Sequence, residues 1–128
     1  MATIYERVEE LEAKHIDSGW IPLTLLNGVL PYGNGTNVPR YRKIGNIVYL
    51  TGGVKNITAR GTTIANLPAD FRPVNGFPFV QNTSHENNIA QFIRWNISAN
   101  GDVIMFYNSN SDLNAEDWYP ISCSFPVD

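Results

Sequence analysis

The chain has 128 residues with a net charge of −3, and only 16% of them are charged. This length predicts one domain, and the 43% hydrophobic and 12% aromatic fractions are enough to build its core. The slightly acidic balance argues against a nucleic-acid-binding protein, which would carry a basic face. With no long apolar run, one cysteine and two histidines, we expect no membrane span, no signal peptide, no cofactor and no metal site.

Residues 1–17 predict a short helical stalk. Thr3 and Glu6 fit a capping box, and the helix should end near Asp17-Ser18-Gly19. Apolar and half-apolar side chains recur at intervals of three and four residues, as in a heptad repeat; they are Met1, Ile4, Val8, Leu11 and His15.

A helix this short is marginal in water, so its apolar stripe needs a partner. One alternative is that the stripe packs back on its own domain. The other is that identical chains pack together in a trimeric coiled-coil stalk through Ile4, Val8 and Leu11. We favour the coiled coil, because the stripe is narrow and the remaining surface is heavily charged.

Residues 18–128 predict an all-β head domain, an antiparallel β-barrel, sandwich or jelly roll. Gly, Pro and Asn residues recur as turn signals between short apolar or alternating runs. The expected strands lie at about 20–26, 29–32, 39–44, 46–54, 62–67, 77–83, 89–98, 102–108 and 117–126.

Two local patterns add detail to this head. Residues 89–97 alternate with period two, which places Trp95 on the core face and Arg94 on the outer face. The following Asn100-Gly101 is a strong hairpin signal. The pair Gly52-Gly53 interrupts an apolar run and predicts a bulge.

Catalytic chemistry finds little support in the sequence. His85 lies in the polar segment 82–88, which we interpret as a solvated loop, and Cys123 lies in an alternating strand as a small core residue. Asp112, Glu116 and Asp117 form the one tight acidic group, but they match neither a Ca²⁺-binding EF-hand loop nor a glycosidase acid pair. We therefore expect a protein that is not an enzyme.

The remaining chemistry is that of sugar binding, which combines aromatic faces with amide, carboxylate and guanidinium groups. Aromatic candidates are Trp20, Tyr32, Tyr41, Tyr49, Trp95, Tyr107, Trp118 and Tyr119. Trp118 follows a polar, acidic segment and is the better surface candidate. Our hypothesis is a saccharide site in which His85, Arg94, Asp112 and Trp118 converge at one end of the barrel.

The order of features resembles the receptor-binding tips of tail and baseplate proteins from phages of Gram-positive bacteria, such as lactococcal siphophages. A helical stalk is followed by several short segments that carry the resemblance. They are Ser18–Leu23, Leu26–Gly28, Pro39–Val48, Ile64–Pro68, Phe71–Pro73, Ile97–Gly101 and Phe125–Asp128.

The resemblance implies a homotrimer on the virion, at a tail tip or baseplate exposed to the host surface. It implies compact antiparallel heads and partners among other tail or baseplate proteins. Such heads bind host-wall saccharides or teichoic-acid-like polymers with Trp, His, Arg and acidic side chains near subunit boundaries. These types map loosely onto His85, Arg94, Asp112 and Trp118, and the basic segment 40–72 offers groups for wall phosphates.

Competing functions remain open from sequence. The first is a carbohydrate-binding adhesion module, and the second is a purely structural trimeric tip or baseplate component without a ligand. A glycan-cleaving enzyme is disfavoured by the missing acid pair, and a cytokine-like head or bacterial lectin shares the same build. A concave site with an exposed Trp near His85 and Asp112 would favour the first function, whereas burial of all three Trp residues would favour the second.

Overall fold

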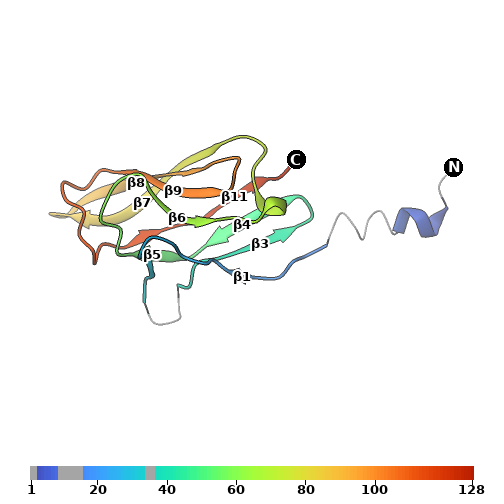
Figure 1. Cartoon of the computed structure of the whole chain (residues 1–128), viewed down its shortest axis with the longest axis horizontal. Coiled ribbons are helices and arrows are strands. Elements are labelled where there is room, and N and C mark those ends of the chain that lie inside the picture. The colour runs from blue at the N-terminus through green and yellow to red at the C-terminus, as the bar shows by residue number, and fades with distance from the viewer. Residues whose placement is uncertain (1–2, 9–15, 34–36) are drawn as a thin grey trace.

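A computed structural model describes residues 3–8, 16–33 and 37–128. Antiparallel strands form three sheets (Figure 1), named here after one strand of each: the β4 sheet (order β1-β3-β4-β11), the β5 sheet (β10-β5-β2) and the β8 sheet (β6-β9-β8-β7). Their bounds are β1 Ile21–Pro22, β2 Leu30–Pro31, β3 Arg40–Ile44, β4 Ile47–Thr51, β5 Gly53–Lys55, β6 Thr62–Asn66, β7 Phe77–Glu86, β8 Ile89–Ile97, β9 Asp102–Asn108, β10 Tyr119–Pro120 and β11 Cys123–Pro126, with a 3₁₀ turn, η1, at Ala69–Phe71.

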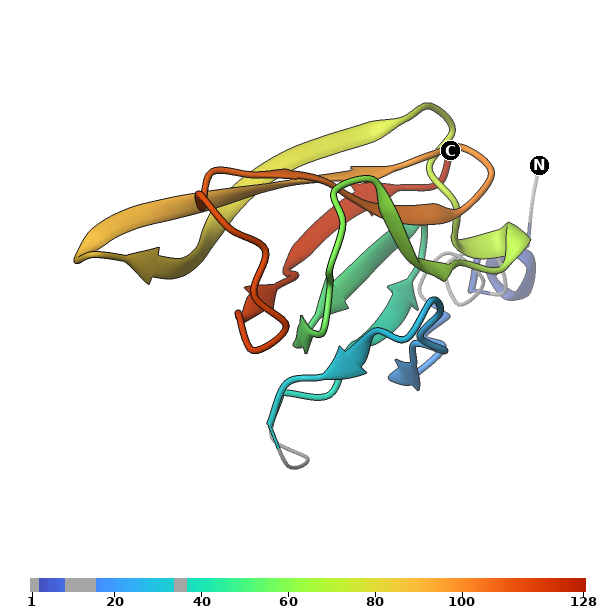
Figure 2. The same cartoon turned by 60° about the vertical axis from the view of Figure 1, so that its left-hand side comes forward.

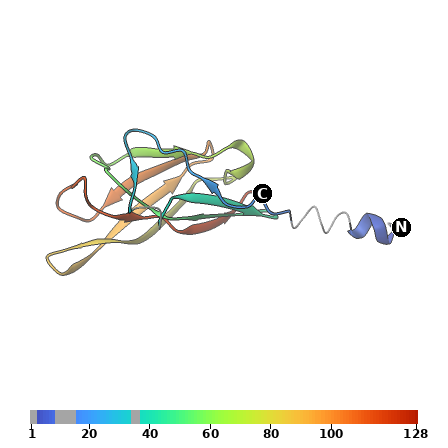
Figure 3. The ribbon, with the colours of Figure 1, turned by 90° about the horizontal axis from the view of Figure 1, so that it is seen from below.

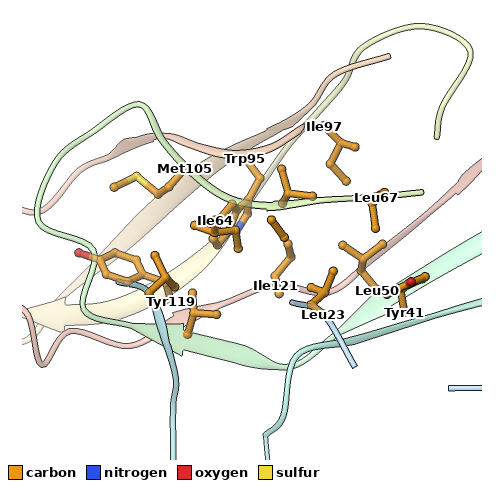
Figure 4. Packing of buried hydrophobic residues seen from close by; sticks show 14 of the residues in the cluster. Leu23, Tyr41, Leu50, Ile64, Leu67, Trp95, Ile97, Met105, Tyr119 and Ile121 are labelled. Carbon is orange, nitrogen blue, oxygen red and sulfur yellow. The ribbon is translucent and has the colours of Figure 1, made fainter. Parts of the chain in front are cut away.

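The core lies between the β8 sheet and the other two sheets, which form the opposite layer (Figure 2). Trp95 of β8 is fully buried, as its alternation predicted, and its indole Nε1 donates to the Pro120 carbonyl at 3.0 Å. Ile121 lies below it in the same buried cluster, and Leu50 of the facing layer lies farther along that cluster, near Leu67 (Figure 4). Burying such large side chains is the main favourable term in the fold.

Two predicted strands each divide between sheets. The expected strand 46–54 leaves the β4 sheet at Gly52 and continues in the β5 sheet, so the break is a change of sheet. Gly52 has φ +127°, and a Cβ there would lie 2.5 Å from Pro39 Cα, so only glycine fits. The expected strand 117–126 divides in the same way, and the Ile121 N–H donates to the Gly52 carbonyl at 2.9 Å.

Strand β1 is shorter than the expected 20–26. It pairs with β3 only at Ile21 and Pro22. The chain then leaves the ladder: the Leu23 N–H donates to the Pro39 carbonyl, and the Leu26 N–H donates to Ile64 of the other layer. This segment closes one side of the core instead of extending the sheet.

The segment 82–88 is a strand end and a tight turn, so its interpretation as a loop is wrong. Strand β7 runs on to Glu86, and the turn consists of Asn87 and Asn88, which have φ values of 52° and 63°. Both are left-handed, as a two-residue type I′ hairpin turn requires. The polar residues of this segment predicted a solvated loop. In the structure, the hydroxyls of Thr83 and Ser84 instead donate to the Trp118 carbonyl.

The β8–β9 hairpin is confirmed. Ile97 pairs with Val103, and the turn is closed by the Gly101 N–H donating to the Ser98 carbonyl at 2.9 Å. Gly101 has φ +94°, a conformation that Gly adopts without strain.

The N-terminal residues confirm the predicted helix start. Residues 4–8 are helical and lie away from the sheets (Figure 3). The Thr3 N–H donates to Glu6 Oε2 at 3.1 Å, and the Glu6 N–H donates to Thr3 Oγ1 at 3.2 Å, which completes the capping box. Ile4 is 80% exposed and Val8 44%. Leu11 and His15 lie outside the described residues, and the coiled coil stays a prediction.

Candidate functional site

His85 and Asp112 lie on neighbouring segments near the β7–β8 turn. Both side chains are exposed. Glu86, which follows His85, accepts a hydrogen bond from the Ser111 N–H at 3.0 Å and another from the Ser111 hydroxyl. The end of β7 is thereby attached to the segment that carries Asp112.

Trp118 joins the same neighbourhood, but its ring serves mainly in packing. The backbone N–H of Trp118 donates to Ser84 Oγ at 2.9 Å, and the centroid of its ring lies 6.0 Å from that of the Tyr32 ring. A Cβ on Gly53 would lie 2.5 Å from the indole Nε1, so the indole rests directly on the Gly53 backbone. Among the described residues this Nε1 is buried without a hydrogen-bond partner. The half-buried ring offers little open face.

Arg94 is not brought to this group. Its neighbour Trp95 faces the core, so Arg94 points to the outer face of the β8 sheet. There the guanidinium lies 4.9 Å from the Phe106 ring centroid, and its Nε lies 3.4 Å from Asn96 Oδ1. The structure therefore joins the segments that carry His85, Asp112 and Trp118, and it places Arg94 further along β8 on the outer face of the sheet. Ligand binding by these residues stays a prediction.

A second surface combines aromatic and polar groups, on the outer face of the β4 sheet. Tyr41, Val48 and Leu50 face the core, so the alternate positions of β3 and β4 face outward. Strand register sets Arg42 beside Tyr49 and Arg40 beside Thr51, and Tyr49 also pairs with β11. We call this surface the Trp20 face; its members are Trp20, Arg40, Arg42, Tyr49, Thr51, Ser122 and Ser124.

Two adjacent hollows flank Trp20, which is 39% exposed. The first has a volume of about 400 Å³ and is lined by Trp20, Pro22, Asn37, Val38, Arg40, Thr51 and Gly52. The second has a volume of about 390 Å³ and is lined by Trp20, Tyr49, Leu50, Thr51, Ser122, Cys123 and Ser124. Because Trp20 and Thr51 line both, the two hollows adjoin each other.

The turn before β1 holds Trp20 in place. The Asp17 carboxylate accepts from the Gly19 N–H at 2.8 Å and from both Nε and a terminal nitrogen of Arg42. The Arg42 hydrogen bond, followed by that from Gly19, lowers the pKa of Asp17 to about 2. The Ser18 N–H also donates to the Lys43 carbonyl at 2.9 Å, which fixes the turn to β3.

The two arginines of this face differ in their charge balance. Their guanidinium carbons lie 4.6 Å (Arg40) and 5.5 Å (Arg42) from the centroid of the Trp20 ring. Arg42 is paired with Asp17. Arg40 forms no ion pair within the described part of the chain. The face therefore carries one uncompensated guanidinium beside an exposed indole.

Other chemistry is scarce among residues 3–8, 16–33 and 37–128. Burial raises the pKa of the Cys123 thiol to about 12, which keeps it protonated and unreactive. No group of three or more His, Cys, Asp or Glu side chains in these ranges is placed to hold a metal ion. No helix in them is long and apolar enough to cross a membrane.

Sequence reasoning named Trp20 among the aromatic candidates and noted the basic segment with Arg40 and Arg42, but it did not connect them. The connecting signal is strand register. If residues 20–22 pair antiparallel with residues 40–42, the outward positions of both strands fall on one face.

No protein-family model and no curated protein sequence matches the chain. Two solved structures share its fold. The receptor binding protein of Listeria phage PSA matches with a TM-score of 0.58 and 15% identity, over 98% of this chain and 81% of that one. The head domain of the lactococcal phage bIL170 matches with a TM-score of 0.58 and 19% identity, over 84% of this chain and 96% of that one. The chain thus has the fold of receptor-binding heads from phages of Gram-positive bacteria.

Proposed function

We propose that this chain is the head of a phage receptor-binding protein that attaches the virion to a saccharide of a Gram-positive host wall. The observation that carries the proposal is the match of fold to two receptor-binding proteins, over 98% and 84% of this chain. Because one fold hosts many functions, the chemistry of its surface must add its own support.

The surface chemistry supports a saccharide receptor. Trp20 is 39% exposed and lines two surface hollows, whereas Trp118 is half-buried. Because Trp20 is exposed, the burial of all three Trp residues expected of a ligand-free structural tip is not found. The hydroxyl and guanidinium groups around Trp20 match what sugar hydroxyls and wall phosphates require.

Homotrimer formation is part of the proposal. The helix exposes Ile4 and Val8, and the outer face of the β8 sheet exposes Val80, Phe92 and Phe106 by 61%, 42% and 49%. Exposed apolar groups of this kind are typical of surfaces that another subunit covers. Three sites on one tip raise avidity by orders of magnitude without new contacts, which suits weak saccharide binding.

This function places the protein in the virion, at a tail tip or baseplate, with other tail proteins as its partners. The test is binding of the fluorescently labelled chain to intact cells of a broad panel of Gram-positive strains. We expect saturable binding restricted to some strains and competed by free monosaccharides or glycerol phosphate. A folded protein that binds no strain would contradict the proposal and favour the structural tip.

A further inference from the structure

We propose that the Trp20 face is the saccharide-binding site of this head. The inference rests on the proposed function and says where on the molecule that function resides. It moves the site from the predicted group around Trp118 to the outer face of the β4 sheet, which lies in the opposite layer of the fold from Arg94.

The first argument is shape. Sugars bind by laying the apolar face of the ring on an aromatic side chain. Trp20 stands between the two hollows, and Tyr49, 38% exposed, lies in the second. Each hollow, at about 400 and 390 Å³, falls within the roughly 300–1,000 Å³ of small-molecule sites. Together the two hollows offer space for a short saccharide beside Trp20 and Tyr49.

The second argument is hydrogen-bonding capacity. Arg40 forms no ion pair among the described residues and is exposed, so its fork of N–H donors is open to vicinal hydroxyls or to a phosphate. The exposed hydroxyls of Ser122 and Ser124 lie along the second hollow. They make no side-chain hydrogen bond within the described ranges.

The third argument is preorganisation. The Asp17–Arg42 pair and the Gly19 N–H fix the turn that presents Trp20. A site held this way loses little side-chain entropy when ligand binds. By contrast, the Trp118 indole is packed on Gly53, and opening its face for a sugar would disturb that packing.

The experiment compares how much Trp20 and Trp118 each contribute to binding. Binding of Trp20→Ala and Trp118→Phe to isolated cell walls of a strain bound by the natural chain would be measured by titration. Trp20→Ala removes one stacking platform from each site, and trimeric avidity multiplies the effect. We expect Trp20→Ala to weaken binding by about 10-fold or more. Trp118→Phe, which keeps a packed ring on Gly53, should bind like the natural chain.

A second pair of variants tests the contribution of the Arg40 guanidinium. Arg40→Ala should weaken binding, whereas Arg94→Ala, which removes an exposed arginine on the other sheet, should leave it unchanged once light scattering has shown that both variants keep the natural mass. Comparing walls before and after removal of their phosphate groups shows whether Arg40 contacts phosphate or hydroxyl. If Trp20→Ala fails to fold, the exposed Arg40 decides the matter, because unchanged binding in Arg40→Ala overturns the proposal.

The outcomes separate this inference from the proposed function. Suppose that the natural chain binds walls and that both variants, Trp20→Ala and Arg40→Ala, bind as well as it does. The site then lies elsewhere, and the proposed function stands. Loss of binding in His85→Ala, Asp112→Ala and Trp118→Phe, with both Trp20-face variants unaffected, would restore the predicted group. If the natural chain binds no wall at all, the proposed function itself fails.

Discussion

At the scale of single residues, Gly52 determines where the chain passes from one sheet to another. Its φ of +127° is strained for any other residue, and the Pro39 backbone occupies the space where a side chain would begin. The clash is with backbone, which cannot swing aside as a flexible side chain can. The same position separates the two halves of the run 47–55 and borders the first hollow.

We predict that Gly52→Ala lowers the free energy of unfolding by about 2–4 kcal/mol, from backbone strain plus overpacking. Urea denaturation followed by tryptophan fluorescence measures this change. Gly76→Ala is the matched control, since a Cβ at Gly76 meets nothing within 4 Å; its effect should stay within about 0.5 kcal/mol. Equal effects of the two changes would refute the packing account of Gly52.

Asp17 makes a pH-dependent contribution to stability. Its pKa is lowered from 3.8 to about 2 by the Arg42 hydrogen bond and then by that of Gly19. At pH values between these two pKa values, the unfolded chain binds the proton more readily than the folded chain does. The free energy of unfolding therefore falls as the pH falls. The contribution is complete above about pH 4 and lost near pH 2.

The measurement for Asp17 is the Tm of the natural chain and of Asp17→Asn from pH 7 to pH 2. We predict a higher Tm for the natural chain at neutral pH and a gap that closes between about pH 4 and pH 2. Because the pair is solvent-exposed, added salt should also narrow the gap. A gap that persists unchanged at pH 2 would contradict the assignment.

At the scale of elements, the predictions succeed where apolar period and turn chemistry agree. The β8–β9 hairpin combines alternation around Trp95 with the Asn100-Gly101 turn, and both appear in the structure. They fail where a polar strand is needed for tertiary hydrogen bonds. Thr83 and Ser84 look like loop residues in sequence, but their hydroxyls hold the Trp118 backbone, a contact between residues more than thirty positions apart.

The β7–β8 turn offers a test of this element. Asn87 and Asn88 both adopt left-handed conformations, which cost less for Gly than for Asn. We predict that Asn88→Gly, which creates the favoured Asn-Gly pair, raises the free energy of unfolding by about 0.5–1 kcal/mol. Asn88→Val should lower it, because a β-branched residue is strained at positive φ. Thermal unfolding of both variants tests the turn assignment, which a stabilising Val would refute.

At the scale of the whole molecule, composition could predict that aromatic and polar side chains share the surface but not where they gather. Trp118 follows a polar segment, which favoured it as the exposed indole, yet its ring covers Gly53. Trp20 precedes an apolar run, which suggested no special role. Only the pairing of β1 with β3 brings it beside Arg40 and Arg42. Such long-range register is not contained in any local pattern.

Substitutions in the N-terminal helix test the proposed homotrimer. We predict that the natural chain has a mass in solution of three times 14.3 kDa and that Val8→Asp reduces it, because a charge in a coiled-coil seam is costly to bury. Arg7→Asp places the same carboxylate off the stripe and should leave the trimer intact. Light scattering coupled to size exclusion measures both variants. A Val8→Asp protein with the natural mass would exclude the helix as the trimer seam.

The central claim is that this head recognises a wall saccharide. The most direct measurement is binding of the natural chain to isolated walls of a bound strain, after protease treatment and, separately, after periodate oxidation of the sugars. We predict that binding survives protease and is lost on oxidation, which is the behaviour expected of a carbohydrate receptor. Loss of binding after protease, with oxidised walls still bound, would show a protein receptor and contradict the claim.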